Sequence, residues 1–501
     1  MLTRKAILNA LAAFIDQAAR ILVGFIVTPL LVRYLGVVDF GVWQILQKMS
    51  IQLSAFDGRA AETLKWTVAN DQSKNDEEKK RRIVGAAVTL FILFLPLLIL
   101  INAIWWWMAP EYIGVEQSSV SLVRYCVLIL SANLILIAIF SILEAILRGV
   151  NKGYKRIGVL ALILILGGAL NVLAVSSGYG LVGISCVQII VSLLTFLTYY
   201  RVVRRHVSWA GIAKPKVKEV TGMFSKAKWF VFWAFINIGI YAGDVILLGF
   251  FSGSEVVSQY VLTFYAANMI TVAILTAVSS VLPGLGGLVG AGQLERASSL
   301  RIESLLISWI LSSTICAILF ALNKSFIYLW VGEHAYIGDM ANLLIIFSAF
   351  QLVFIRHDAF MLNMMLDIKR KVLYGAISLA LTILLAFLLV PKFGVIGLSG
   401  SLILGRSLLS IIYPRLIRQF LTGKAEHGIN LRKITVTLLV FVLCFYSGSY
   451  LALDSWWSLF IAGCFLGLLA FSLFIIVGAN KDDKAILIRR MTAIKFSIVN
   501  K

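Results

Sequence analysis

The sequence is poor in charged residues. Asp, Glu, Lys and Arg make up only 14% of its 501 residues, whereas soluble proteins contain about 25%. Hydrophobic residues make up 60% of the chain, and many apolar runs reach the roughly 18 residues that cross a bilayer. Because the backbone must satisfy its hydrogen bonds within each segment in lipid, such runs form helices. The composition therefore excludes a soluble globular protein and predicts an all-α membrane protein.

The motifs of several active sites are also missing. A phosphate-binding loop needs Gly-Lys followed by Ser or Thr, and the one Gly-Lys pair, Gly423-Lys424, precedes Ala425. Residues 178–183 match a dinucleotide-binding fingerprint, but they lie in a tight turn between two membrane helices. No metal-ligand spacing relates the four histidines, which are His206, His334, His357 and His427. We therefore expect no enzyme, no cofactor and no metal site.

The apolar runs predict about 14 transmembrane helices, since each run is long enough to span the bilayer. The first helix carries Asp16 and Arg20, so we do not expect it to be a cleaved signal peptide. The predicted helices cover residues 7–33, 38–66, 83–108, 119–148, 157–177, 181–203, 228–251, 256–282, 300–322, 340–365, 371–391, 396–418, 433–453 and 456–478.

Basic residues predict the orientation in the membrane. The net charge is +21, and in a membrane protein an excess of Lys and Arg marks the cytoplasmic side. Clusters at 79–82, 201–218 and 489–490 all fall on one side of the predicted helices. The opposite side holds Arg33, Arg124, Lys324 and Lys392. Both termini are therefore expected to be cytoplasmic, and the positive charge is not taken as a sign of nucleic-acid binding.

The two halves of the chain are related by a repeat. Helices five and six overlay helices eleven and twelve without a gap. Gly180, Gly183, Ser185 and Tyr199 recur 214 residues later (394 − 180) as Gly394, Gly397, Ser399 and Tyr413. A shift of six helices keeps the orientation in the membrane, so the repeat is parallel. It predicts two six-helix lobes around a central cavity. The N-terminal lobe covers 1–203 and the C-terminal lobe covers 228–421. A basic linker (204–227) joins them, and a last segment (422–501) holds two extra helices and a tail.

Arginines inside the predicted helices are candidates for binding an anionic substrate. Ionisable residues at membrane depth are costly and usually face a cavity or a partner. Arg20 and Arg59 belong to the first lobe, and Arg356 and Arg406 to the second. Arg stays ionised and binds phosphate through two parallel hydrogen bonds, so four such residues predict a cationic cavity.

Intramembrane carboxylates are candidates for ion coupling. They are Asp16, Asp244 and Asp358. The alternative is that such charges pair within their own helix. Glu144 and Arg148, four residues apart near the inner surface, are expected to form such a pair. For Asp16 and Arg20, pairing and a role in the cavity remain equally open.

The first hairpin resembles that of polysaccharide-unit flippases. Its apolar helix contains Pro29, ends in the turn Arg33-Tyr34-Leu35-Gly36 and continues with Phe40-Gly41. A second match is the hairpin over residues 151–183. The resembled family forms the polysaccharide transporter branch of the superfamily that also contains MATE-type multidrug exporters and lipid II flippases.

This resemblance implies a function. Members of the family move undecaprenyl-pyrophosphate-linked oligosaccharides from the cytoplasmic to the outer leaflet of the bacterial inner membrane, for O-antigen or related polymers. It further implies membrane lipids, a polysaccharide polymerase and chain-length proteins as partners, and coupling to protons or sodium. A MATE-type cation or drug antiporter remains the alternative. A membrane-embedded polymerase is disfavoured, because the predicted outer loops are short.

Overall fold

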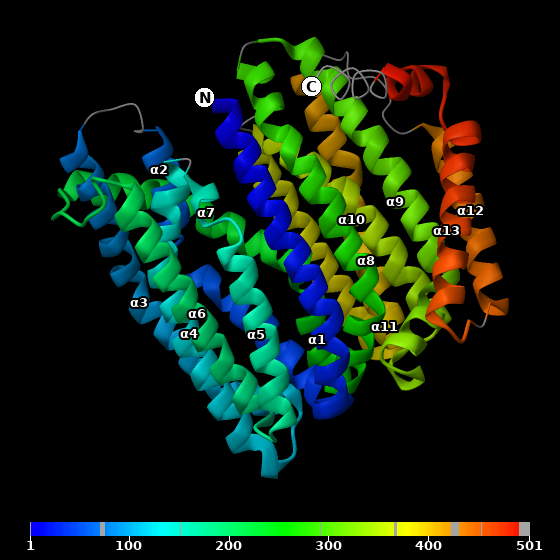
Figure 1. Ribbon diagram of the computed structural model, residues 1–501, viewed down its shortest axis with the longest axis horizontal. Helices are drawn as coiled ribbons and strands as arrows, with labels where there is room; N and C mark the ends of the chain where they lie inside the picture. Colours follow the sequence, from blue (N-terminus) through cyan, green and yellow to red (C-terminus); the bar gives the residue numbers. More distant parts are fainter. Residues whose placement is uncertain are drawn as a thin grey trace. The chain divides into compact units, whose positions relative to one another are not determined.

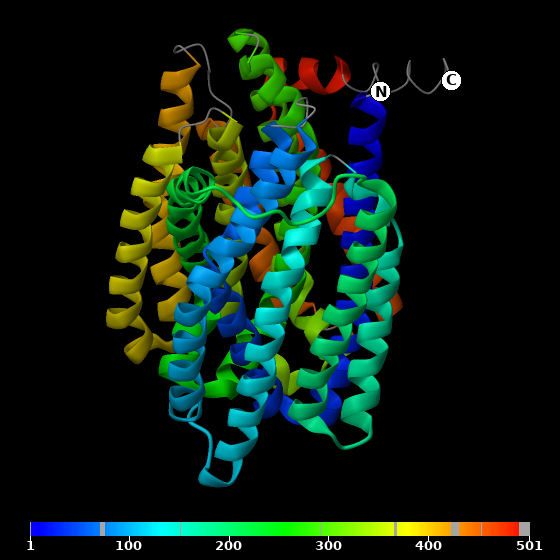
Figure 2. The ribbon, with the colours of Figure 1, turned by 90° about the vertical axis from the view of Figure 1, so that its left-hand side faces the viewer.

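A computed structural model describes residues 2–70, 76–150, 152–290, 292–364, 368–421, 430–451 and 453–489. The Gly423-Lys424 pair, His427 and Arg490 lie outside the described residues. All regular structure in the described part is helical (Figures 1 and 2). Eleven of its helical stretches are long and apolar enough to cross a membrane. The prediction of an all-α membrane protein is therefore confirmed.

Three of the longest helices each contain a glycine at which the chain changes direction. Gly36 divides α1 (Leu2–Leu53), Gly253 divides α8 (Asp244–Gly290) and Gly394 divides α11 (Ile368–Phe420). All three have positive φ, a backbone region that only glycine enters at little cost. With these divisions the 13 α-helices of the described residues form 16 α-helical segments (13 + 3).

The first compact unit is Met1–Ser258. It contains α1, α2 (Ala60–Asn70), α3 (Glu77–Ile113), α4 (Val120–Gly149), α5 (Val159–Ser176), α6 (Gly180–His206), α7 (Val217–Ala242) and the first part of α8. Within this unit α4 packs against α2, α3 and α6, and α5 packs against α1 and α6. Figure 2 shows α3 to α6 running side by side.

The second compact unit is Gln259–Lys501. It contains the rest of α8, α9 (Leu294–Trp330), α10 (Asp339–Met364), α11, α12 (Leu431–Tyr450) and α13 (Trp456–Leu473). Helix α9 packs against α10, α12 and α13, and buried Trp309, Phe320 and Phe441 belong to the core that joins these helices. The two predicted extra helices, α12 and α13, are thus integral to this unit.

The internal repeat extends to the first hairpin of each half. Gly36 (φ 81°, ψ 167°) and Gly253 (φ 79°, ψ 173°) share one unusual conformation, 217 residues apart (253 − 36). The residues seven positions after each glycine, Trp43 and Tyr260, are both 3% exposed. A matching turn followed by a matching buried aromatic is the pattern expected of repeated hairpins.

Candidate transport sites

The second predicted helix, 38–66, is interrupted in the structure. Helix α1 ends at Leu53, a 3-10 turn covers Ser54–Phe56, and α2 begins at Ala60. Between them Gly58 has φ 70°, and Arg59, at φ 48°, is the one non-glycine residue with positive φ in the described part of the chain. The Asp57 side chain accepts a hydrogen bond from the Arg59 backbone N–H at 2.8 Å, which stabilises the turn. The break directly follows Phe14–Phe56, a stretch that is long and apolar enough to cross a membrane.

A polar pocket of about 160 Å³ opens at this break. The charged residues that line it are Asp57, Arg59, Glu62, Lys65, Glu144 and Arg148. Three are acidic and three are basic, so their formal charges sum to zero. The expected Glu144–Arg148 pair is present at 2.6 Å. Arg59 differs from the other two cations, because its Nε lies 3.9 Å from Asp57 and is buried without a hydrogen-bond partner.

Asp16 lies close to a basic residue far away in the sequence. Arg156 Nη1 donates to Asp16 Oδ2 at 2.8 Å, and the two side chains are 10% and 15% exposed. The Arg156 guanidinium also lies 5.5 Å from the ring of Tyr199. Arg20, by contrast, is exposed. Asp16 is therefore in an ion pair, but its partner is Arg156 and not Arg20, which lies one turn along the helix. A role of Asp16 in ion coupling stays a prediction.

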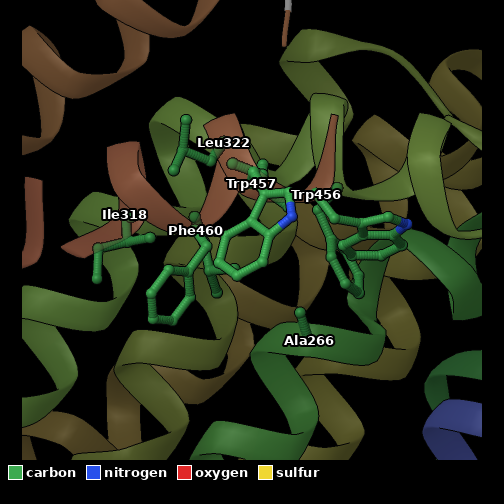
Figure 3. Close-up of a pocket in the computed structure, with 10 residues that line it drawn as sticks. Ala266, Ile318, Leu322, Trp456, Trp457 and Phe460 are labelled. Carbon is green, nitrogen blue, oxygen red and sulfur yellow. The ribbon is translucent and has the colours of Figure 1, made fainter. Parts of the chain in front are cut away.

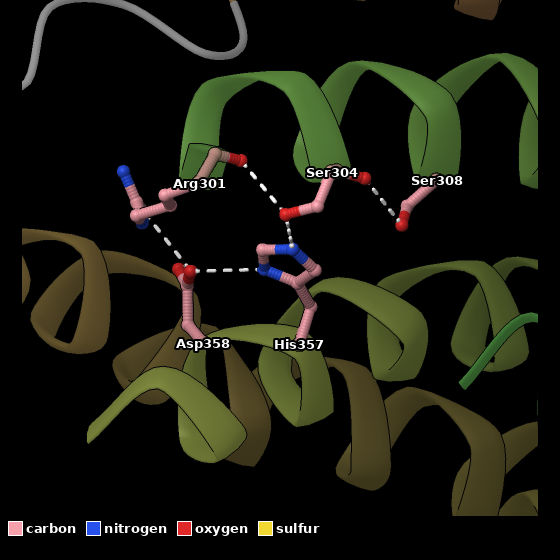
Figure 4. Close-up of polar contacts among 5 residues, drawn as sticks. All are labelled: Arg301, Ser304, Ser308, His357 and Asp358. Atoms are coloured by element: carbon pink, nitrogen blue, oxygen red, sulfur yellow. Dashed lines mark hydrogen bonds and ion pairs between the residues drawn. The ribbon is translucent and has the colours of Figure 1, made fainter. Parts of the chain in front are cut away.

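A second buried network joins α9 and α10 (Figure 4). Arg301 Nη2 donates to Asp358 Oδ1 at 2.9 Å. His357 Nδ1 lies 3.3 Å from the same oxygen, and its Nε2 lies 2.9 Å from Ser304 Oγ. His357 is 0% exposed, and the other three residues are also buried. Two groups therefore share the Asp358 carboxylate. Arg301 is always cationic, and His357 is cationic when both of its ring nitrogens are protonated.

The remaining predicted site residues lie separately in their units. Arg406 is 3% exposed and donates through Nη1 to Ser348 Oγ at 3.1 Å. Arg356 is half-buried on α10. Asp244 begins α8 directly after the break at Gly243, is 7% exposed and accepts from the Val245 N–H at 3.0 Å. The cationic cavity shared by both lobes stays a prediction.

An apolar groove of about 680 Å³ lies within the second unit. Its walls come from α8, α9 and α13. They include Ala266, Ile318, Leu322, Trp457 and Phe460 (Figure 3). Trp457 and Phe460 are 77% and 64% exposed. None of the described residues that line this groove is charged, so it suits a hydrocarbon chain rather than a polar group.

Sequence reasoning missed Arg156, Arg301 and His357. Arg156 and Arg301 stand near the ends of the predicted helices 157–177 and 300–322, where a basic residue is typical of a helix flank rather than of a buried site. A signal was available for Arg301: Ser304, Ser308 and Ser312 follow it at spacings of three or four residues, which is one face of a helix. A polar face on an otherwise apolar helix indicates a polar partner on the helix packed against it.

Comparison with known proteins identifies the fold. No family model matches the sequence, and no curated protein matches it. Solved structures do match. The lipid II flippase MurJ in an inward closed conformation has a TM-score of 0.69 and 14% identity, over 93% of this chain and 98% of MurJ.

Two further matches are transporters. An inward-facing multidrug resistance MATE family transporter of the MOP superfamily has a TM-score of 0.64 and 12% identity, over 83% of this chain and 95% of its own. A MOP superfamily transporter from Pyrococcus furiosus has a TM-score of 0.57 and 14% identity, over 84% and 95%. The chain therefore has the fold of MOP-superfamily transporters.

Proposed function

We propose that this protein is a flippase that moves undecaprenyl-pyrophosphate-linked oligosaccharides from the cytoplasmic to the outer leaflet of the bacterial inner membrane by alternating access. The fold supports a transporter of this superfamily, and one structural neighbour acts on lipid II. Both termini are cytoplasmic in this proposal. Polysaccharide polymerase and chain-length proteins receive the translocated units.

The observation that carries the proposal is the environment of Arg59. Its guanidinium lines a polar pocket at the break between α1 and α2, and its buried Nε has no hydrogen-bond partner among the described residues. A buried donor without an acceptor is costly, and a phosphate oxygen would satisfy it. Arg20, Arg356 and Arg406 are the further arginines proposed to bind the pyrophosphate.

The apolar groove supplies a site for the lipid tail. A lipid-linked sugar needs a polar pocket for its headgroup and an apolar surface for its hydrocarbon, because each CH₂ buried contributes about 0.8 kcal/mol. The groove between α9 and α13 is open and lined by apolar side chains. The polyprenyl chain is the occupant proposed here.

Ion coupling is proposed for the carboxylates Asp16, Asp244 and Asp358, of which Asp244 and Asp358 are buried and Asp16 is half-buried. Asp16 and Asp358 each carry a basic partner. In such pairs, loss or gain of a proton changes the local charge and hence the packing of the two segments that carry the pair.

The proposed function is tested by the lipid-linked intermediates in cells. Cells that lack this protein should accumulate oligosaccharide-linked undecaprenyl pyrophosphate in the inner leaflet and lose surface polymer. Re-expression of the wild-type chain should reverse both effects, whereas Arg59→Ala at equal protein level should not. Normal surface polymer in cells without the protein would exclude this function.

The alternative is a MATE-type cation or drug antiporter. The observation in its favour is that the pocket at Arg59 also contains Asp57, Glu62 and Glu144, which are suitable groups for a cation. This function predicts increased resistance to lipophilic cations when the protein is overexpressed, with surface polysaccharide unchanged when it is removed.

A further inference from the structure

The network in Figure 4 contains a hydroxyl group with two possible acceptors. Ser304 Oγ lies 2.9 Å from the Arg301 carbonyl oxygen and 2.9 Å from His357 Nε2. The carbonyl oxygen can only accept a hydrogen bond, whereas the imidazole nitrogen donates or accepts according to its protonation. Because a serine hydroxyl has a single hydrogen, its direction depends on the state of the histidine.

The other ring nitrogen has a fixed role. His357 Nδ1 lies 3.3 Å from Asp358 Oδ1, which also accepts from Arg301 at 2.9 Å. The adjacent guanidinium favours the ionised carboxylate, and an ionised carboxylate only accepts. His357 Nδ1 must therefore carry a hydrogen in either protonation state.

Counting hydrogens leaves two complete arrangements. In the first, His357 is neutral, Nε2 accepts, and the Ser304 hydroxyl donates to it. In the second, one proton has bound at Nε2, the imidazolium donates to Ser304 Oγ, and the hydroxyl turns to the Arg301 carbonyl. Neither state leaves a buried polar group of the Ser304–His357–Asp358 chain unpaired. The two states differ by one proton on His357 and by one rotation of the Ser304 hydroxyl.

We propose that His357 is the group that binds and releases the coupling proton, with Asp358 as its counter-ion and Ser304 as a positioning residue. This inference rests on the proposed function for its role in transport, and it moves the proton from Asp358, where the sequence places it, to the neighbouring residue. His357 is 0% exposed, so a proton reaches it only when the packing of α9 on α10 changes. Binding of the proton is thereby linked to conformation.

The surrounding charges connect this site to an anionic cargo. Arg301 from α9 and Asp358 from α10 are in hydrogen-bond contact with this network. The packed helices also carry Glu303 on α9, Arg356 on α10, and Lys371 and Arg406 on α11. Helix α8 contributes the apolar Ile274 and Val278. Cations outnumber carboxylates in this set, and they oppose a further positive charge on His357. An anion bound to them would favour protonation, and the linkage is reciprocal.

The test is the titration of the His357 ring by NMR in the purified full-length protein, with labelled histidine and no substrate. His357→Gln identifies its signal, and His334→Gln serves as the control for the exposed His334. We expect one ring nitrogen protonated at high pH and both ring nitrogens protonated at low pH. A ring that keeps one state between about pH 5 and pH 8, the range in which histidine ordinarily changes charge, overturns the proposal.

Two variants examine the partners. Asp358→Asn removes the counter-ion and should lower the midpoint by about one to three pH units. Ser304→Ala should lower it by less, because it removes one acceptor for the imidazolium and no charge. Unchanged midpoints in both variants would show that the network does not control this proton.

A final measurement tests the proton site and the anionic cargo independently of each other. Inorganic pyrophosphate should raise the midpoint if the nearby arginines bind an anion. A titrating His357 whose midpoint pyrophosphate leaves unchanged supports the proton site and counts against the anionic cargo of the proposed function.

Discussion

Arg156 and Asp16 form an ion pair at 2.8 Å across 140 residues of sequence, and it joins the turn before α5 to α1. Neither residue has its partner on its own helix. The pair lies in the first unit, beside the ring of Tyr199. It fixes the position of a carboxylate that the sequence marks for ion coupling.

Removal of either member of this pair should destabilise the protein. Breaking a largely buried pair leaves an uncompensated charge and costs about 3 to 5 kcal/mol. Asp16→Ala and Arg156→Ala should each lower the thermal unfolding temperature in detergent. The double variant should lose much less than the sum of the two. Arg20→Ala serves as the control and should have little effect on stability. Additive losses would mean that the two side chains do not interact.

The arginines of the second unit should determine transport. Hydrogen bonds to charged groups contribute about 1.5 to 3 kcal/mol, so Arg356→Ala and Arg406→Ala should each reduce surface polysaccharide about tenfold or more at wild-type protein levels. Arg406→Lys keeps the charge but not the two parallel donors, and it should restore transport only in part. The exposed Arg204→Ala is the control. Normal polymer in both Ala variants would refute their role in binding the headgroup.

The repeated turn glycines should resist substitution even though space is available. A Cβ at Gly36 or Gly253 would meet nothing within 4 Å. Their φ and ψ values fall in a region that is essentially restricted to glycine, at a cost of about 1 to 3 kcal/mol for other residues. Gly36→Ala and Gly253→Ala should therefore lower the unfolding temperature.

A matched control for these two variants exists on α7. Gly222 is exposed and, like Gly36 and Gly253, has nothing within 4 Å of a Cβ added to it, but it has no positive φ. Gly222→Ala should be neutral or slightly stabilising, since Ala favours a helix over Gly by about 1 kcal/mol. If all three variants behaved alike, backbone conformation would not explain the loss.

Filling the apolar groove should impair transport of a long-chain lipid. A Cβ at Gly463 would lie 3.7 Å from Leu322 Cδ1, so Gly463→Leu adds bulk inside the groove. We expect surface polysaccharide to fall while the protein level is maintained. Leu468→Phe adds bulk to α13 at a residue that is 71% exposed and does not line the groove, and it should leave polymer normal. Equal effects of the two variants would argue against a lipid tail in the groove.

Most of the helices were predictable from the sequence, and most of the interruptions were not. The apolar runs predicted an all-helical membrane protein, because length and hydropathy alone decide whether a segment can span a bilayer. The break between Leu53 and Ala60 was missed, because it depends on the Asp57 side chain and on Arg59 at positive φ. A hydropathy pattern carries no information on such a local hydrogen bond.

By itself the sequence determined an all-helical membrane protein of two repeats, with turns at Gly36, Gly180 and Gly394. It did so because these features depend on local composition and on backbone freedom at single residues. It also predicted the Glu144–Arg148 pair, whose members are neighbours on one helix. Only the tertiary structure decided that Asp16 pairs with Arg156 and that Arg301 and His357 share Asp358. Asp16 and Arg156 lie on different segments of the chain, and Arg301 reaches Asp358, the partner of His357, from another helix. Helix packing, not sequence spacing, therefore brings these charges together.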